Sequence, residues 1–458
     1  MTPWQNEQTL PVAGSRPYRC FPTVRVGRLA ALLCSAVLLC TVSGCGDDEA
    51  PAAGSDTTAG AELKGDFGGQ DYGSLYDARV LQDRSIELGD YSSLAARITY
   101  NSVLGTNFNL LKTTATVFVP RGPVPQNGWT TVALGHPTFG TLKTCAPSLS
   151  RDLRGLGPTV VAFLKAGFAV TVPDYQGLGS GDVSHPYLDS TTVGFNLIDS
   201  VRAARKLVPD MSVRWAAVGM EQGGQGAWAA NELVNTYGGG LDFLGSISVA
   251  PFTDLQGLVD AAAAGTLTDQ QKWTMVAYLN SLKASFKDDV DLDQYRRGAA
   301  QEEWDDLLAC DGHTMDQLYQ TAGEVSADDL RPVNADAVEV LHGFLRKTSL
   351  PQGVSAKPMW VVYGEADPLI PPQWTDVALD RACAYGDVVQ IERQPGWPQS
   401  IDVPRAAEWI NARVSGTPPV NDCANRGGLP AQASPSDGET TTPDEAPPTS
   451  EFEPGTPG

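Results

Sequence analysis

The sequence is poor in basic side chains and in histidine. It holds 32 lysines and arginines against 54 aspartates and glutamates, and 4 histidines in 458 residues, so its formal net charge is −22. A surface of this sign repels phosphate, which excludes nucleic acid as a partner and argues against electrostatic attraction to anionic lipid. Acidity identifies no partner by itself, because it most often serves solubility.

The sequence also lacks the cysteine spacing of a metal site. It contains no Cys-x-x-Cys pair and no cluster of histidine and cysteine with metal-binding spacing. We therefore expect no metal ion and no other cofactor.

The N-terminal apolar run is too short to span a bilayer and has the features of a signal peptide. Arg25 and Arg28 precede the run 29–39, which is followed by Thr41-Val42-Ser43-Gly44-Cys45. Basic residues, a short apolar segment and small residues before a cleavage site are typical of such peptides. The Val-Ser-Gly-Cys ending is similar to a bacterial lipobox, which implies cleavage before Cys45 and lipid on its sulfur. The alternative is a signal peptide with a chance cysteine.

We therefore predict a lipoprotein signal peptide over 1–44, with a true translation start near Val24 or Val26. The mature chain would be a cell-envelope lipoprotein on the outer side of a bacterial membrane, held there through Cys45, or a secreted protein.

Composition divides the rest of the chain. Residues 45–63 read as a flexible tether, and 424–458 as a disordered acidic tail rich in Pro, Thr and Ser. The folded part between them has a core over 64–251 and 355–423, interrupted by residues 252–354. Its cysteines form an even set in an exported chain, which favours disulfides with three possible pairings: Cys145, Cys310, Cys383 and Cys423.

Apolar runs alternate with helical patterns along the core. Strands are expected at 114–120, 131–134, 169–173, 213–218, 245–249, 359–363 and 388–394. Helices are expected at 160–166, 193–207, 225–236, 375–385 and 405–415. This alternation predicts a mostly parallel α/β sheet with helices on both faces and a binding site at the carboxyl ends of its strands.

The most informative stretch joins one of these strands to the next helix. It reads Gly219-Met220-Glu221-Gln222-Gly223-Gly224, which is the G-x-S-x-G turn of a nucleophile elbow with glutamate at the serine position. The glycines allow a turn too sharp for side chains. No serine elsewhere in the chain has glycine two residues before and two residues after it.

Residues 252–354 interrupt the alternation with mainly helical patterns. Helices are expected at 255–264, 269–285, 291–308 and 333–346. The insertion is either a cap over the pocket or a separate helical domain, and its place directly after the strand that follows the elbow favours the cap.

The chain resembles the secretory lipases of the α/β-hydrolase superfamily, a group of bacterial and fungal triacylglycerol lipases. Besides the elbow, the resemblance rests on motifs in the family's order: Gly135-His136-Pro137-Thr138-Phe139-Gly140-Thr141, Cys145-Ala146-Pro147-Ser148, Val172-Pro173-Asp174-Tyr175-Gln176-Gly177-Leu178-Gly179, His185-Pro186-Tyr187, Asp199-Ser200-Val201-Arg202-Ala203-Ala204-Arg205 and Gly364-Glu365-Ala366-Asp367. It implies an α/β-hydrolase fold with a helical cap, and the disulfides Cys145–Cys310 and Cys383–Cys423.

Acyl transfer in this fold needs a nucleophile, an acid and a base in that chain order. The resemblance puts Glu221 at the nucleophile position and Asp367 at the acid position. Asp367 is alternatively a turn or N-cap residue before Pro368. The base position falls in the loop 394–399, where Trp397 or a neighbour stands, and an indole cannot take a proton at neutral pH.

The four histidines all precede that loop. His136 and His185 lie in family-like loops, where one of them lining the pocket competes with the more common structural role. His313 and His342 lie in the helical insertion and are expected to be packed or solvent-facing.

Oxyanion donors are backbone N–H groups and survive side-chain replacement. We expect them at Gln222 and, from the loop 136–140, at Pro137 and Thr138. One hypothesis is that the Glu221 carboxylate folds toward these donors and occupies the anion site itself, at the N-terminus of a helix.

Three functions fit these residues. The first is a lipid-anchored, non-hydrolytic lipase homologue that binds an apolar or ester-like small molecule or an envelope protein, with tryptophans available to line an apolar cleft. The second is an active lipase or carboxylic ester hydrolase, or a carboxylate-nucleophile hydrolase that uses Glu221 with or without Asp367 as its acid–base partner. The third is an envelope lipoprotein whose acidic tail reaches a partner.

Overall fold

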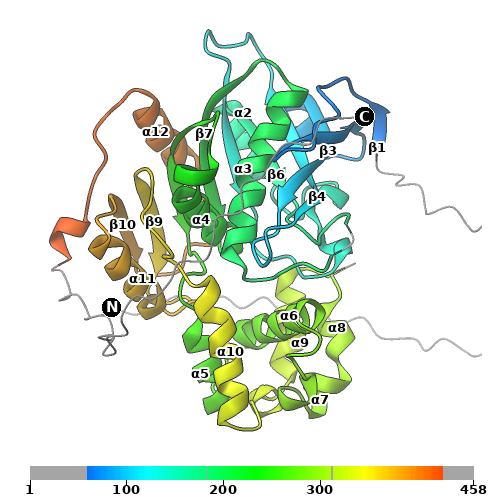
Figure 1. The fold of residues 1–458 in the computed structure, drawn as a ribbon, viewed down its shortest axis with the longest axis vertical. Coiled ribbons are helices and arrows are strands. Elements are labelled where there is room, and N and C mark those ends of the chain that lie inside the picture. The colour runs from blue at the N-terminus through cyan, green and yellow to red at the C-terminus, as the bar shows by residue number, and fades with distance from the viewer. Residues whose placement is uncertain (1–58, 182, 311–312, 427–458) are drawn as a thin grey trace, which may run out of the picture. The chain divides into compact units, whose positions relative to one another are not determined.

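A single mixed sheet organises the described residues, which are 59–181, 183–310 and 313–426 of this computed structural model. Within them the sheet has ten strands in the order β1-β2-β3-β4-β6-β5-β7-β8-β9-β10 (Figure 1). The strands are β1 (Ala59–Glu62), β2 (Leu75–Leu81), β3 (Ser92–Val103), β4 (Leu110–Pro120), β5 (Trp129–Gly135), β6 (Ala169–Pro173), β7 (Met211–Met220), β8 (Asp242–Val249), β9 (Met359–Gly364) and β10 (Val389–Gln394).

The sheet is parallel over one part and antiparallel over the other. Strands β6, β5, β7, β8, β9 and β10 run parallel, as the alternation of strands and helices predicted. Strands β1 to β4 pair antiparallel with their neighbours, and β4 also pairs antiparallel with β6. The central strands β6, β8 and β9 are almost entirely buried and mostly apolar, because helices cover both faces of the sheet.

Helices cover both faces of the sheet. On one face α1 (Ile86–Tyr91), α2 (Gly157–Lys165) and α12 (Val403–Val414) bury apolar side chains against the strands. On the other face, apolar side chains are buried against the strands by α3 (Ser190–Leu207), α4 (Gln222–Tyr237) and α11 (Pro372–Ala384). The short 3-10 helices η1 (Lys143–Cys145), η2 (Pro147–Leu149) and η5 (Cys423–Asn425) lie in connections. No helix of the described residues is long and apolar enough to cross a bilayer.

The insertion between β8 and β9 is helical. It contains α5 (Gln256–Ala264), α6 (Asp269–Ser285), η3 (Leu292–Gln294), α7 (Gly298–Glu302), α8 (Trp304–Leu308), α9 (Met315–Glu324), η4 (Ala327–Leu330) and α10 (Ala335–Thr348). These helices gather beyond one end of the sheet (Figure 1). Their apolar cluster includes Ala250, Leu369 and Ile370 from loops that follow β8 and β9, so the insertion packs on the carboxyl ends of the strands.

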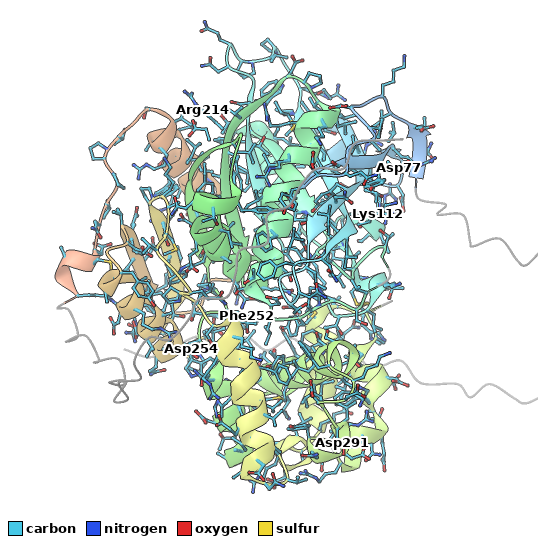
Figure 2. The ribbon with its side chains drawn as sticks, in the orientation of Figure 1. Asp77, Lys112, Arg214, Phe252, Asp254 and Asp291 are labelled. Atoms are coloured by element: carbon cyan, nitrogen blue, oxygen red, sulfur yellow. A yellow bond between two sulfur atoms is a disulfide. The ribbon has the colours of Figure 1, made fainter. Side chains whose placement is uncertain are left out.

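The chain enters the insertion through a buried and ion-paired segment. Phe252 lies where the insertion helices meet the sheet (Figure 2) and is fully buried. The carboxylate of Asp254 forms an ion pair of 3.0 Å with Arg381 of α11. Burial and this ion pair fix the start of the insertion to the core.

The expected helix over 291–308 is interrupted in the structure. It is replaced by η3, α7 and α8, because Arg297 is extended and Gly298 has a φ of +50°, which ends one turn and begins another. Helix α9 was not expected. Strands β1, β2 and β3 were also not expected, because polar residues such as Asn101 and Ser102 are buried in β3 and hide its pattern.

The expected tether 45–63 ends in a strand. Residues Ala59–Glu62 form β1, which pairs antiparallel with β2, because an exposed edge of a sheet accepts another strand through its backbone. The rest of that segment, the predicted signal peptide with Cys45, and the tail from residue 427 lie outside the described residues.

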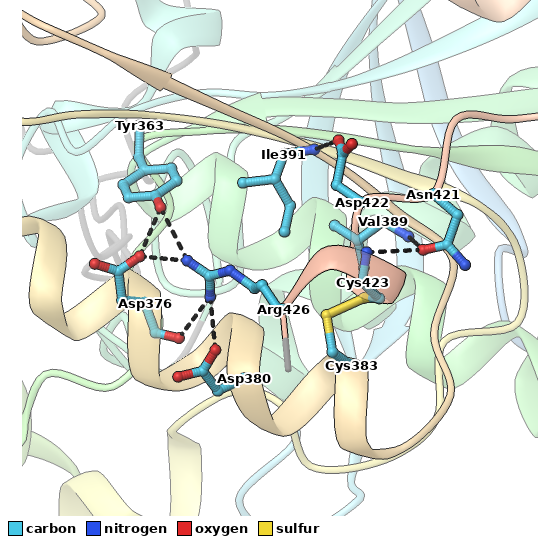
Figure 3. The surroundings of a disulfide bond; sticks show 10 residues. All are labelled: Tyr363, Asp376, Asp380, Cys383, Val389, Ile391, Asn421, Asp422, Cys423 and Arg426. Atoms are coloured by element: carbon cyan, nitrogen blue, oxygen red, sulfur yellow. Dashed lines mark hydrogen bonds and ion pairs between the residues drawn. A yellow bond between two sulfur atoms is a disulfide. The ribbon is translucent and has the colours of Figure 1, made fainter. Parts of the chain in front are cut away.

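Two disulfides hold connections in place. They are Cys145–Cys310 and Cys383–Cys423, the pairs that the family resemblance implied. Cys145 lies in η1, and Cys310 follows α8 of the insertion. Around the second disulfide, Arg426 forms ion pairs with Asp376 and Asp380 of α11 (Figure 3).

Candidate active site

The turn between β7 and α4 has the backbone geometry of a nucleophile elbow. Glu221 lies between the two elements with φ +51° and ψ −115°, a region that costs a non-glycine residue about 1–3 kcal/mol. A Cβ atom on Gly219 would overlap the backbone of Gly223. One on Gly223 would overlap the backbone of Gly135 at the end of β5. The glycines are therefore required by close approach of backbone to backbone.

Backbone hydrogen bonds hold the strained residue. The N–H of Glu221 donates to the carbonyl of Val249 at 3.0 Å, and the carbonyl of Glu221 accepts from Phe252 N–H at 3.2 Å. A Cβ atom on Gly224 would lie 3.0 Å from the Val249 oxygen, so α4 begins in tight contact with the end of β8. Because the surrounding backbone fixes the turn, the elbow persists without a serine.

The side chains at the three triad positions line one cavity of about 410 Å³. Glu221 comes from the elbow, Asp367 from the loop after β9 and Trp397 from the loop after β10. The loop after β5 contributes its wall at 137–139, and the insertion contributes Gln270, Met315, Asp316 and Tyr319 from α6 and α9. Parallel strands end at the same edge, which is why positions so distant in sequence converge.

Glu221 is a carboxyl group with a raised pKa. Burial and the nearby charge of Asp367 raise the pKa of Glu221 to about 7, against a smaller lowering effect of the Thr138 backbone N–H. The group is therefore divided between its neutral and charged forms near neutral pH.

The loop after β5 corrects one expected oxyanion donor. Pro137 has no backbone N–H and cannot donate; its carbonyl instead lies 2.6 Å from His136 Nδ1. The backbone N–H of Thr138 opposes the rise in the pKa of Glu221, and Thr138 as an oxyanion donor stays a prediction. The Glu221 side chain makes no capping hydrogen bond to the first turn of α4, which counts against the hypothesis that it occupies an anion site formed with Gln222 N–H. Gln222 as an oxyanion donor stays a prediction.

Asp367 is held by its own turn. Its carboxylate accepts hydrogen bonds from the N–H groups of Leu369 at 2.8 Å and Ile370 at 3.0 Å. Burial raises the pKa of Asp367, and these two hydrogen bonds oppose that rise. Asp367 therefore has the geometry of a turn residue and also lines the cavity, and its role as the acid stays a prediction.

Trp397 occupies the loop in which the base was sought. The loop is fixed beside Asp367, because Glu365 N–H donates to the carbonyl of Gln394 at 2.8 Å and Ala366 N–H donates to that of Gly396 at 3.3 Å. The indole is 38% exposed and is a hydrogen-bond donor only. It forms a wall of the cavity and takes no proton.

The histidines do not line this cavity. His185 is buried, with Nδ1 2.9 Å from the carbonyl of Gln176 and Nε2 2.8 Å from the amide nitrogen of Gln222. Burial lowers the pKa values of His185 and His136 to about 4 each, so both rings are neutral near pH 7. His342 lies 3.1 Å from Asp260, and His313 lines a neighbouring cavity with Asp316.

Helix α9 supplies site residues that the sequence analysis missed. Met315, Asp316 and Tyr319 come from this helix, which begins with Thr314 as a reciprocal cap together with Gln317. That Thr-x-x-Gln spacing is a recognised helix-start signal and would have located α9.

The parallel sheet, the strained turn between β7 and α4, and the insertion over the strand ends define an α/β-hydrolase. The chain belongs to the secretory lipase family, whose model matches residues 157–422. A search of curated proteins found no match.

Solved structures share this fold at low sequence identity. Lipase A of Candida antarctica in its closed state has a TM-score of 0.62 at 16% identity, covering 76% of this chain and 84% of that one. A putative hydrolase of Legionella pneumophila has a TM-score of 0.59 at 18% identity, covering 75% and 97%. The ligand-bound rice cell wall degrading esterase LipA of Xanthomonas oryzae has a TM-score of 0.59 at 16% identity, covering 75% and 95%.

Proposed function

We propose that this secretory lipase family member binds an apolar or ester-like molecule and does not hydrolyse it. The carrying observation is that the elbow presents the Glu221 carboxylate to a cavity in whose described lining no histidine or serine occurs. Ester hydrolysis in this fold requires a nucleophile that is deprotonated by a base, and later a water activated by that base. The described lining of the cavity offers neither a serine nor a histidine for these two steps, which supports the proposal.

A carboxylate nucleophile is the competing proposal. Aspartate acts this way in some α/β-hydrolases, but a charged carboxylate must attack and a base must then activate water. The pKa of Glu221 near 7 leaves part of the population protonated, and Asp367 is already an acceptor for two backbone N–H groups. Once Glu221 is esterified it cannot act as that base, and the described lining of the cavity offers no histidine for the role.

We further propose that the chain is exported and carries lipid at Cys45, which would hold the cavity at a membrane surface. Two disulfides and membership of a secretory family support export. The lipid rests on the sequence Val-Ser-Gly-Cys alone. An envelope protein is the alternative ligand at the same surface.

The test is hydrolysis of p-nitrophenyl butyrate and p-nitrophenyl octanoate by the purified full chain. Wild type and Glu221→Ala should both show no rate above the protein-free reaction. The double variant Glu221→Ser with Trp397→His restores the missing side-chain types on an intact elbow and should gain turnover. Turnover by wild type that Glu221→Ala abolishes would show that the carboxylate is catalytic and would end the binding proposal.

A further inference from the structure

The charged side chains that line the cavity are all acidic. They are Glu221, Asp367 and Asp316, and the described lining includes no lysine, arginine or histidine. Arg154 lines the neighbouring cavity, and its guanidinium donates to the carbonyls of Thr144 and Cys310. The Asp367 carboxylate accepts hydrogen bonds from the N–H groups of Leu369 and Ile370, and the Thr138 backbone N–H opposes the rise in the pKa of Glu221.

Glu221 and Asp367 repel each other. Both carboxylates line the same cavity, and the charge of Asp367 raises the pKa of Glu221. A neutral ester leaves this repulsion in place, and a fatty acid anion adds a third like charge. A cation placed between the carboxylates removes the repulsion and is attracted by both.

The remaining walls suit an apolar body and a cationic group. Their larger apolar side chains include Phe139, Met220, Met315, Leu369 and Ile370. The rings of Tyr319 and Trp397 also line the cavity, and aromatic faces attract ammonium groups. The aromatic rings are an observation independent of the carboxylates, and both favour the same ligand charge.

We propose that the cavity binds a hydrophobic cation, an aliphatic or aromatic body that bears an amine or quaternary ammonium group. The ammonium group lies between Glu221 and Asp367. The apolar body contacts the apolar lining residues, such as Met220, Met315 and Leu369. The net charge of −22 draws such a ligand toward the protein. This inference rests on the proposed binding function and specifies its ligand class.

The experiment compares three probes with one octyl chain and different charge: octyltrimethylammonium, 1-octanol and octanoate. Calorimetric titration of the purified full chain at pH 8 should give the tightest binding for the cation, by about tenfold over octanol, and the weakest for octanoate. Glu221→Gln should remove most of the preference for the cation while octanol binding stays unchanged, which also shows that the cavity is intact.

Glu365→Gln is the matched control. Glu365 lies two positions before Asp367, is exposed, pairs with Arg393 at 3.4 Å and does not line the cavity, so its variant should bind all three probes as wild type does. Octanol or octanoate binding as tightly as the cation, no binding of any probe, or an unchanged preference in Glu221→Gln would each overturn the inference. Octanol binding as tightly as the cation, without ester turnover, would overturn the cation alone and leave the proposed function standing.

Discussion

At residue 221 the chain combines a strained backbone with a carboxylate that is partly protonated near neutral pH. The φ of +51° is the conformation that an elbow imposes on whatever residue it carries. Glutamate adds to that cost, because its charge is unfavourable in a cavity that already holds Asp367. The strained backbone and the charge near Asp367 both lower the stability of the fold. A residue with both costs is better explained by a role in a ligand site than by a role in packing.

The raised pKa of Glu221 predicts a pH-dependent gain in stability for Glu221→Gln. Its folded-state pKa of about 7 lies above the unfolded value of 4.5, so the neutral form stabilises the fold at low pH and this contribution is lost as the pH rises through 7. The variant should therefore raise the free energy of unfolding by about 1–3 kcal/mol at pH 8, and by less at pH 5.5. Urea unfolding at both values measures this.

The control for this prediction is again Glu365→Gln, which should show no such pH dependence. The groups that interact with Glu221 from the packed elements are Asp367, Tyr187 and Tyr319. The pKa values of both tyrosines are raised from 10, so the tyrosines stay neutral over this range. A gain in Glu221→Gln that is equal at both pH values would assign the effect to something other than its titration.

At the scale of elements, the elbow depends on contact between β5, β7 and α4. Gly135, Gly219 and Gly223 let the three backbones approach without side chains between them. Gln222 of α4 also binds the ring of His185, which links the helix to the loop after β6. The position of Glu221 is thus set by element packing and not by its own side chain.

A methyl group at this contact should be costly. In Gly223→Ala the new Cβ overlaps the backbone of Gly135, so β5 or α4 must move, and the free energy of unfolding should fall by about 2–4 kcal/mol. Gly239→Ala is the matched control, because it is exposed and no atom lies within 4 Å of its added Cβ. Chemical denaturation of both variants measures the difference, and equal stability would refute the close-approach argument.

At the scale of the whole molecule, the insertion and the core act as one apolar unit. One cluster joins the insertion helices to loops of the core, and the Cys145–Cys310 disulfide closes a separation of 165 residues between them. Cross-linking of this length strongly restricts the unfolded chain. The wall that α9 contributes to the cavity is therefore held against the elbow.

The proposed anchor gives the whole-molecule prediction. When cells that express the full chain are extracted with Triton X-114, the protein should partition into the detergent phase. Cells grown with labelled palmitate should incorporate the label into the protein. Cys45→Ser should move the protein to the aqueous phase and remove the label, because a lipid chain supplies about 0.8 kcal/mol of membrane affinity per buried CH₂. Cys40→Ser, which leaves Val42-Ser43-Gly44-Cys45 unchanged, should behave as wild type. Equal partitioning of Cys45→Ser and wild type would contradict the anchor.

Much of the core could be predicted from residues 114 to 415 without coordinates. Strands such as 169–173 are continuous apolar runs, because both faces of a central parallel strand are buried. The antiparallel strands β1 to β3 escaped prediction, because half-exposed or polar strands carry weak patterns. The helix expected over 291–308 is interrupted at Gly298, which has a positive φ, and the spacing of apolar residues does not reveal such a backbone conformation.

The sequence by itself determined the α/β alternation, the family and the glutamate at the elbow, because these follow from local patterns and from the glycines that the turn demands. Only the tertiary structure decided that Glu221, Asp367 and Trp397 share one cavity, that α9 closes it, and that the two buried histidines lie outside it. Burial and the charge of Asp367 in the folded protein also raise the pKa of Glu221. Burial and the distance between carboxylates are properties of packing, which no local pattern in the chain contains.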